Sequence, residues 1–188
     1  MIIGSICENK DTEKRISVTP ENVKKFISNG FRVYLEKNYA NHLDIEDEKF
    51  IENGAEFFED KQKIIKESDI LLQLNLLNEK DLNHLTANKN LIGVFDPINN
   101  KDLISKISKK NVNIFSLELL PRITRAQSMD ILSSQANLAG YKAVVDAFSF
   151  FNKAIPMMMT AAGTIPAAKI LVVGAGVAGL QAIATAKR

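Results

Sequence analysis

Cysteine and histidine are scarce in this 188-residue sequence. Cys7 is the only cysteine, so the chain can form no internal disulfide, and this composition fits a reducing compartment. His42 and His84 are the only histidines, and neither has a cysteine or carboxylate partner at the spacing of a metal site. We therefore predict that the chain holds no metal.

A strong charge imbalance and long apolar runs are missing as well. The net charge of +2 does not indicate the clustered basic surface of a nucleic-acid-binding protein, and a content of 46% hydrophobic and 24% charged residues excludes general disorder. The N-terminus lacks the basic and apolar regions of a signal peptide. The uncharged run 170–186 barely reaches the length of a membrane-spanning helix and contains several glycines, so we expect a soluble chain.

The first two thirds of the chain alternate between apolar strand patterns and amphipathic helix patterns. Thr19-Pro20 marks the start of one helix and Gly30 its end. This alternation predicts βαβ units and a mainly parallel sheet in an α/β fold. The predicted strands are 2–7, 31–35, 70–74, 90–95 and 112–117, and the predicted helices are 20–29, 44–53, 61–68 and 99–110.

Charged residues become rare after residue 113, which indicates a segment that is buried by folding or by partners. One long helix is predicted over 128–151, and Gly140 in its middle suggests close backbone packing. An uncharged connection, 154–168, follows. We expect an N-terminal α/β domain over 1–127, a linking helix and connection over 128–168, and the start of a further domain at 169–188.

A polar stretch, 121–135, interrupts these apolar surroundings directly after a predicted strand. It contains two arginines, an amide, a carboxylate and three serines, and ligands of open α/β sheets bind at the carboxyl ends of strands. Buried polar groups need partners, so these side chains either satisfy one another or await a ligand. On a helix, Gln127, Asp130 and Ser134 would share one face.

The segment 169–187 has the pattern of a dinucleotide-binding turn. An apolar strand, 170–173, leads into Gly174-x-Gly176-x-x-Gly179 and an apolar helix. These glycines would allow a tight turn, close approach of a pyrophosphate, and helix–strand packing, respectively. The acidic residue expected on the ribose about 20 residues later falls beyond Arg188. We therefore expect a truncated chain that carries half a dinucleotide site and binds NADH poorly on its own.

The sequences PRITRAQSMDILSSQANLAGYKAVVDA and PMMMTAAGTIPAAKILVVGAGVAGLQAIATAKR resemble the NAD(H)-binding component, the alpha subunit, of proton-translocating NAD(P) transhydrogenases. The resemblance is dense over 118–188 and looser over 1–117. It implies a Rossmann-like or flavodoxin-like N-terminal domain followed by an NAD-binding Rossmann domain. It also implies direct hydride transfer between NAD(H) on this chain and NADP(H) on a partner domain, coupled to proton movement.

The same resemblance implies roles for individual residues. Arg122, Asp130 and Ser133 would hold the nicotinamide carboxamide, and Gln127 would reach the NADP(H) ribose. The full set of implied catalytic and cofactor-binding residues is Arg122, Gln127, Ser128, Met129, Asp130, Ser133, Val172, Gly174, Gly176, Val177 and Gly179. The implied partners are an NADP(H)-binding domain, a membrane domain and a second copy of the chain, at the cytoplasmic face of a membrane.

Two alternatives remain open at this point. Alanine dehydrogenases share the two-domain fold, but they use a lysine where this chain has Gln73, and a histidine where LIGVFDP has none. The other alternative is a non-catalytic fragment that only dimerises. Reduction of pyruvate with ammonia would distinguish the first alternative from a transhydrogenase component.

Overall fold

The computed structural model describes residues 1–187 of the chain and separates into two compact units, Met1–Leu120 and Pro121–Arg188. The division into three segments that the sequence suggests stays a prediction.

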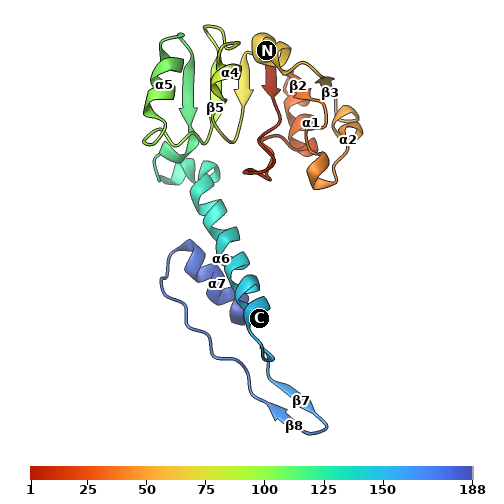
Figure 1. Ribbon diagram of the computed structural model, residues 1–188, viewed down its shortest axis with the longest axis vertical. Helices are drawn as coiled ribbons and strands as arrows, with labels where there is room; N and C mark the ends of the chain where they lie inside the picture. Colours follow the sequence, from red (N-terminus) through yellow and green to blue (C-terminus); the bar gives the residue numbers. More distant parts are fainter. Residues whose placement is uncertain (188) are drawn as a thin grey trace. The chain divides into compact units, whose positions relative to one another are not determined.

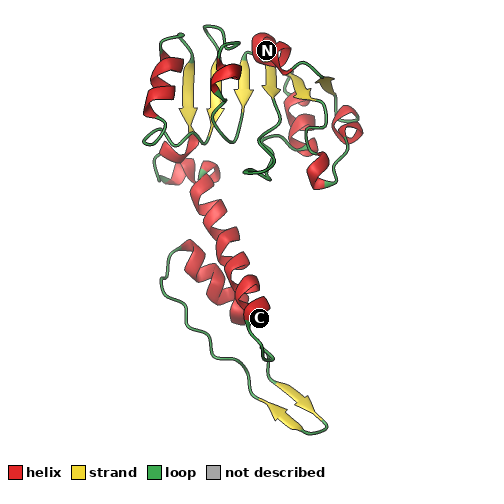
Figure 2. Ribbon diagram, in the orientation of Figure 1, coloured by secondary structure: helices red, strands yellow, loops and turns green. Residues whose placement is uncertain are grey.

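The first unit is built on a six-stranded sheet (Figures 1 and 2). Every neighbouring pair of strands is parallel, which confirms the predicted α/β class. The spatial order β3-β2-β1-β4-β5-β6 is that of a doubly wound sheet, in which successive strands are added first on one side of β1 and then, from β4 onward, on the other side. The strands are β1 Ile2–Ser5, β2 Arg32–Glu36, β3 Ala55–Phe58, β4 Ile70–Leu72, β5 Asn90–Gly93 and β6 Asn113–Ser116.

Helices connect these strands, and local sequence signals set their ends. Thr19 caps α1 by accepting a hydrogen bond from the Asn22 backbone N–H at 3.3 Å, and Gly30, with a φ of 82°, follows its end. The helices of this unit are α1 Pro20–Ser28, α2 Asp47–Ile51, α3 Lys61–Glu67, α4 Glu79–Leu82 and α5 Lys101–Ser108, with 3₁₀ turns at η1 Asn41–Leu43 and η2 Leu117–Leu119.

Two hydrophobic clusters form the core of this unit. The alternation of side chains along β2 divides between them: Val33 and Leu35 pack in one cluster and Tyr34 in the other. Both faces of the sheet are therefore buried, as a parallel sheet with crossover helices requires.

Three details of this unit differ from the sequence expectations. The predicted helix 44–53 is shorter and is preceded by the 3₁₀ turn η1, because Asp44 adopts a left-handed φ of 56° that breaks a continuous helix. The edge strand β3 was not predicted, because Glu56 interrupts its short apolar pattern. The helix α4 was missed because its four residues are little more than one helical turn.

The second unit contains two helices and a hairpin: η3 Thr124–Met129 and α6 Ile131–Phe150, then β7 Met158–Thr160 with β8 Gly163–Ile165, then α7 Val177–Lys187 (Figure 1). The predicted helix start at residue 128 was wrong, because a 3₁₀ turn precedes Asp130 and the α-helix begins after it. The hairpin lies in the segment 154–168, which was predicted only as an uncharged connection.

The predicted strand 170–173 was also wrong. A strand requires a hydrogen-bonded neighbour, and none pairs with this segment within residues 1–187. It is extended, and the side chains of Leu171 and Val173 are 87% and 91% exposed.

Helices α6 and α7 pack closely against each other. A Cβ atom placed on Gly140 would lie 2.1 Å from the Ala178 carbonyl oxygen, so the contact requires glycine and the predicted close packing is confirmed. Four residues further along each helix, Val144 and Ala182 are both buried. The buried positions advance by four residues in the same sense along both helices, so α6 and α7 run in the same direction (Figure 1). Among residues 1–187, no helix is both long and apolar enough to cross a membrane.

Candidate functional site

Asp130 organises the polar stretch that precedes α6. Its carboxylate accepts a hydrogen bond from the Ser133 backbone N–H at 2.9 Å and another from the Ser133 hydroxyl at 2.7 Å. The first contact caps the helix, and the second fixes the position of the hydroxyl. Asp130 and Ser133 are therefore held in a fixed relative position by two hydrogen bonds, and we call them the Asp130–Ser133 pair.

Arg122 and Gln127 lie beside this pair. A shallow cavity of about 240 Å³ brings the two residues together with Asp130 and is lined by Arg122, Ile123, Thr124, Ala126, Gln127 and Asp130. The hydrogen bonds from the Ser133 backbone and hydroxyl hold the pKa of Asp130 below its usual value, and the positive charge of Arg122 adds to this effect. The site thus presents a carboxylate that is ionised at neutral pH next to a guanidinium.

The remaining side chains of the stretch have other positions. Ser134 donates its hydroxyl to the Asp130 carbonyl oxygen at 3.0 Å, and Gln127 lies in the 3₁₀ turn, so the expected helical face of Gln127, Asp130 and Ser134 does not form. Ser128 and Met129 are exposed, Met129 by 51%. No sequence pattern had pointed to Thr124 or Ala126 as cavity residues; their place between Arg122 and Gln127 was the only available signal.

The glycine turn before α7 is tight at Gly174 and Gly179, although the predicted strand does not precede it. Gly174 adopts a φ of 109°, a conformation that favours glycine. A Cβ atom on Gly179 would lie 2.0 Å from the Gly174 carbonyl oxygen, so the helix packs tightly on the turn. At Gly176, by contrast, a Cβ atom would meet nothing within 4 Å. Gly176 therefore has no packing role within the described residues and leaves open space beside the first turn of α7.

Both halves of the predicted site lie at the same end of the α6–α7 pair. The helices run in the same direction, and Gly140 marks their point of contact at the start of α7. Ser133 lies seven residues earlier on α6, which is close to two turns and on the same face, about 10 Å along the axis at 1.5 Å per residue. The Asp130–Ser133 pair therefore lies beyond the N-terminus of α7, on the side to which that terminus points.

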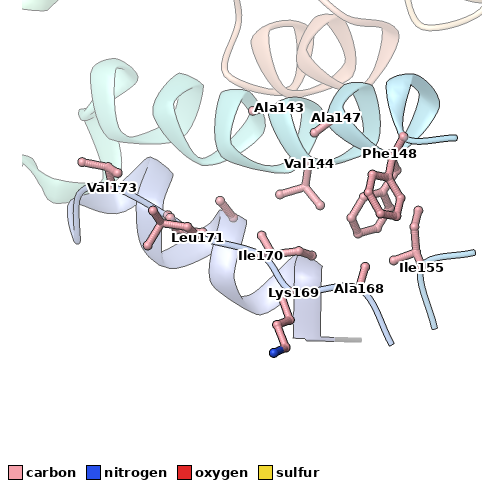
Figure 3. Close-up of a pocket in the computed structure, with 13 residues that line it drawn as sticks. Ala143, Val144, Ala147, Phe148, Ile155, Ala168, Lys169, Ile170, Leu171 and Val173 are labelled. Carbon is pink, nitrogen blue, oxygen red and sulfur yellow. The ribbon is translucent and has the colours of Figure 1, made fainter. Parts of the chain in front are cut away.

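An apolar cavity of about 450 Å³ lies further along the same helices (Figure 3). Val144 and Phe148 of α6, Ala182 of α7 and the extended segment 168–173 line it, and Figure 3 shows that segment running along the helices. Val172, which the resemblance placed among the cofactor-binding residues, is one of the lining residues. Apart from Lys169, the residues that line the cavity are apolar, so it offers mainly apolar contact.

Gln73 lies at the carboxyl end of β4 in the first unit and is fully engaged. Its side-chain oxygen accepts hydrogen bonds from the Ile6 backbone N–H at 2.8 Å and the Ser5 hydroxyl at 3.1 Å. Its side-chain nitrogen donates to the Ile6 carbonyl oxygen at 3.3 Å, and the side chain is buried. This position therefore supplies a structural amide and no ionisable group.

Comparison with known proteins places these features in a family. The model of the alanine dehydrogenase/PNT N-terminal domain matches residues 4–139, and that of the alanine dehydrogenase/PNT C-terminal domain matches residues 143–188. An NAD(P) transhydrogenase alpha-subunit chain of Rickettsia prowazekii is 42% identical over 192 residues, which cover 100% of this chain and 50% of the relative.

Solved structures agree with this assignment. The crystal structure of transhydrogenase from Sinorhizobium meliloti matches with a TM-score of 0.93 and 44% identity, covering 100% of this chain and 56% of that one. An L-alanine dehydrogenase matches with a TM-score of 0.81 and 17% identity over 100% of this chain and 52% of that one, which indicates a shared fold. The chain spans about half the length of these relatives. It belongs to the alanine dehydrogenase/PNT family and is similar to the alpha subunit of NAD(P) transhydrogenase.

Proposed function

We propose that this chain is the NAD(H)-binding part of a proton-translocating NAD(P) transhydrogenase. In this proposal, the glycine turn 174–179 and the polar residues Arg122–Ser133 bind one NAD(H) molecule between them. The observation that carries the proposal is the open space at Gly176, at the same end of the α6–α7 pair as the Asp130–Ser133 pair.

The glycine turn would hold the pyrophosphate. Backbone N–H groups in the first turn of a helix lack intrahelical partners and carry partial positive charge, which favours a phosphate there. In α7 the first turn follows Gly176, whose open side lets a phosphate approach the backbone. The residues present therefore fit the phosphates of a dinucleotide.

The polar stretch would orient the nicotinamide ring. A carboxamide has one acceptor and two donor hydrogens, and here Arg122 supplies donors and Asp130 an acceptor. The hydroxyl of Ser133 is already fixed by Asp130, so little ordering remains for binding. NAD(H) would supply the hydride chemistry when bound, and Arg122, Asp130 and Ser133 would hold and orient its ring. No proton donor is needed at this site.

The same proposal includes partners. Gln127 is exposed and would contact the ribose of NADP(H) on a partner domain. We also propose a second copy of the chain as a partner, and attachment at the cytoplasmic face of a membrane through a membrane domain. The apolar side chains that the second unit exposes, among them Leu138, Tyr141 and Phe150, supply surface for such contacts.

The alanine dehydrogenase alternative is disfavoured by Gln73. Alanine dehydrogenases use a lysine at this position, whereas in this chain the amide of Gln73 is bound to Ile6 and Ser5. The alternative of a dimerising fragment without catalysis predicts self-association without any response to NADH.

One experiment separates these three functions. The chain is mixed with NADH and an NADP⁺ analogue, with and without the remaining subunits of a transhydrogenase, and separately with pyruvate and ammonia. We expect hydride transfer to the analogue only when those subunits are present, and none to pyruvate. NADH oxidation by pyruvate and ammonia in the chain alone would contradict the proposal. An Arg122→Ala variant, which removes the donor for the carboxamide, should lose the transfer.

A further inference from the structure

The strand order of the first unit has a switch point between β1 and β4, which is where open α/β sheets bind ligands. Strands β2 and β3 lie on one side of β1 and strands β4, β5 and β6 on the other, and ligands bind outside the carboxyl ends of the strands at such a switch point. In this chain the residues that leave β1 and β4 at that point include Glu8 and Gln73–Asn75. No glycine-rich turn follows β1, so a dinucleotide is not expected there.

The carboxylate of Glu8, which follows β1, accepts hydrogen bonds from residues 73–75, which follow β4 on the other side of the switch point. One oxygen accepts hydrogen bonds from the Leu74 backbone N–H at 2.6 Å, the Asn75 backbone N–H at 3.3 Å and the Gln73 side-chain nitrogen at 3.3 Å. The other oxygen accepts one from the Asn75 side chain at 3.1 Å. Two successive backbone N–H groups and two amide side chains thus surround one carboxylate.

This set of donors is an anion-binding site in chemical terms. Backbone N–H groups on consecutive residues bind carboxylates and phosphates, and hydrogen bonds to an ionised acceptor are stronger than neutral ones. Arg15 adds positive charge near Glu8, although Glu13 engages its guanidinium at 2.7 Å. The site differs from an ordinary ligand site in one respect: its anion belongs to the chain.

Similar contacts recur along the same edge of the sheet. Glu36, at the end of β2, accepts from the Cys7 backbone N–H at 2.7 Å. Glu118, after β6, accepts from the Phe95 backbone N–H at 2.9 Å and the Asp96 backbone N–H at 2.5 Å. Each carboxylate binds the N–H groups at the end of a neighbouring strand, but only Glu8 spans the switch point.

We propose that Glu8 is a built-in ligand that closes a carboxylate-binding site at the switch point, and that it determines specificity by excluding small carboxylic acids. A tethered carboxylate has a high effective concentration, so a free acid cannot compete with it. Removing Glu8 then opens the site to a small monocarboxylate. This inference concerns the first unit and is independent of NAD(H) binding by the second.

The test titrates acetate into the full 188-residue chain and follows backbone amide resonances by NMR. In Glu8→Ala, we expect saturable shifts at Leu74 and Asn75, with acetate binding at least about tenfold tighter than to the wild type. Glu8→Gln keeps a side-chain oxygen for the Leu74 N–H, so its response should stay near that of the wild type. Glu52→Ala, at an exposed position, is the matched control and should resemble the wild type.

Equal shifts in the wild type and in Glu8→Ala, or no shifts in a folded Glu8→Ala, would overturn the proposal. If Glu8→Ala does not fold, acetate should restore folding, because a ligand that binds only the native state stabilises it. Failure of acetate to restore folding, when chloride at the same ionic strength serves as the reference, would equally overturn it.

Discussion

Asp130 has two tasks that single-residue changes can separate. It caps α6 through the Ser133 backbone, and it carries the charge that faces Arg122 in the shallow cavity. Asparagine is as good a helix cap as aspartate but has no charge. An asparagine at position 130 would therefore keep the helix cap but remove the charge, which separates the structural role of Asp130 from its proposed role in ligand binding.

We expect Asp130→Asn to retain the melting temperature of the wild type while weakening NADH binding. The amide oxygen can still accept from the Ser133 backbone, but the negative charge near Arg122 is lost. Thermal unfolding and NADH titration measure the two effects. Asp130→Ala, which removes the cap as well, serves as the control and should lower both. Unchanged NADH binding in Asp130→Asn would contradict the assigned role.

Glu13 provides a pH-dependent contribution to stability in the first unit. The hydrogen bond from Arg15 lowers its pKa from 4.5 to about 2. A carboxyl group with a lowered pKa in the folded state stabilises the protein above its unfolded pKa, and this contribution disappears as pH falls. We expect the stability difference between wild type and Glu13→Gln to shrink between pH 4.5 and about 2. Denaturant unfolding across this range measures it, and a constant difference would contradict the expectation.

At the scale of elements, the contact between α6 and α7 depends on Gly140. Alanine is ordinarily better than glycine inside a helix by about 1 kcal/mol. Here the added Cβ would approach the Ala178 carbonyl oxygen to 2.1 Å, so the helices would have to separate. We expect Gly140→Ala to lower the free energy of unfolding by about 1–3 kcal/mol, the usual cost of overpacking.

The control for this substitution is Asn137→Ala at an exposed position of α6, which should leave stability unchanged or raise it slightly. Chemical denaturation of both variants gives the comparison. A stabilised Gly140→Ala would show that α6 and α7 do not pack as described.

Most regular elements could be predicted from the sequence because their signals are local. Thr19-Pro20 and Gly30 mark α1 correctly, and Gly140 indicated close packing before any contact was known. The strand β3 was missed because Glu56 interrupts its apolar pattern, and the hairpin β7–β8 because its strands lie in an uncharged segment without alternation of apolar and polar residues. The start of α6 was wrong because a polar 3₁₀ turn and a polar helix look alike in sequence.

The site was only partly accessible to the same reasoning. Spacing located Gly174, Gly176 and Gly179, and composition located the polar stretch, but neither indicated that Asp130 binds Ser133. The ligand contacts of Glu8 depend on strand order, which no local pattern reveals. Roles of residues toward NAD(H) rest on the family resemblance and stay predictions.

At the scale of the whole molecule, the second unit exposes a large amount of apolar surface. Leu171 is 87% exposed and Leu180 is 58% exposed. Exposed apolar patches of this kind are interaction sites or aggregation liabilities. We expect the isolated chain to self-associate as its concentration rises and Leu171→Glu to reduce this association without changing helix content. Sedimentation velocity with circular dichroism measures both, and Lys153→Glu, which changes charge at an exposed polar position, is the control. A monomeric wild type at high concentration would contradict this expectation.

The central claim is that NAD(H) binds at the glycine turn and the polar stretch of the second unit. NADH titrated into the isotope-labelled chain, followed by amide NMR, tests it most directly. We predict weak binding in the millimolar range, with shifts at Gly174–Val177 and Asp130–Ser133. Gly176→Ala should abolish the shifts at the turn, because the added Cβ atom occupies the open side from which a phosphate would approach. It should keep the melting temperature, because that Cβ atom meets no protein atom within 4 Å. Shifts confined to the first unit, or unchanged shifts in Gly176→Ala, would contradict the account.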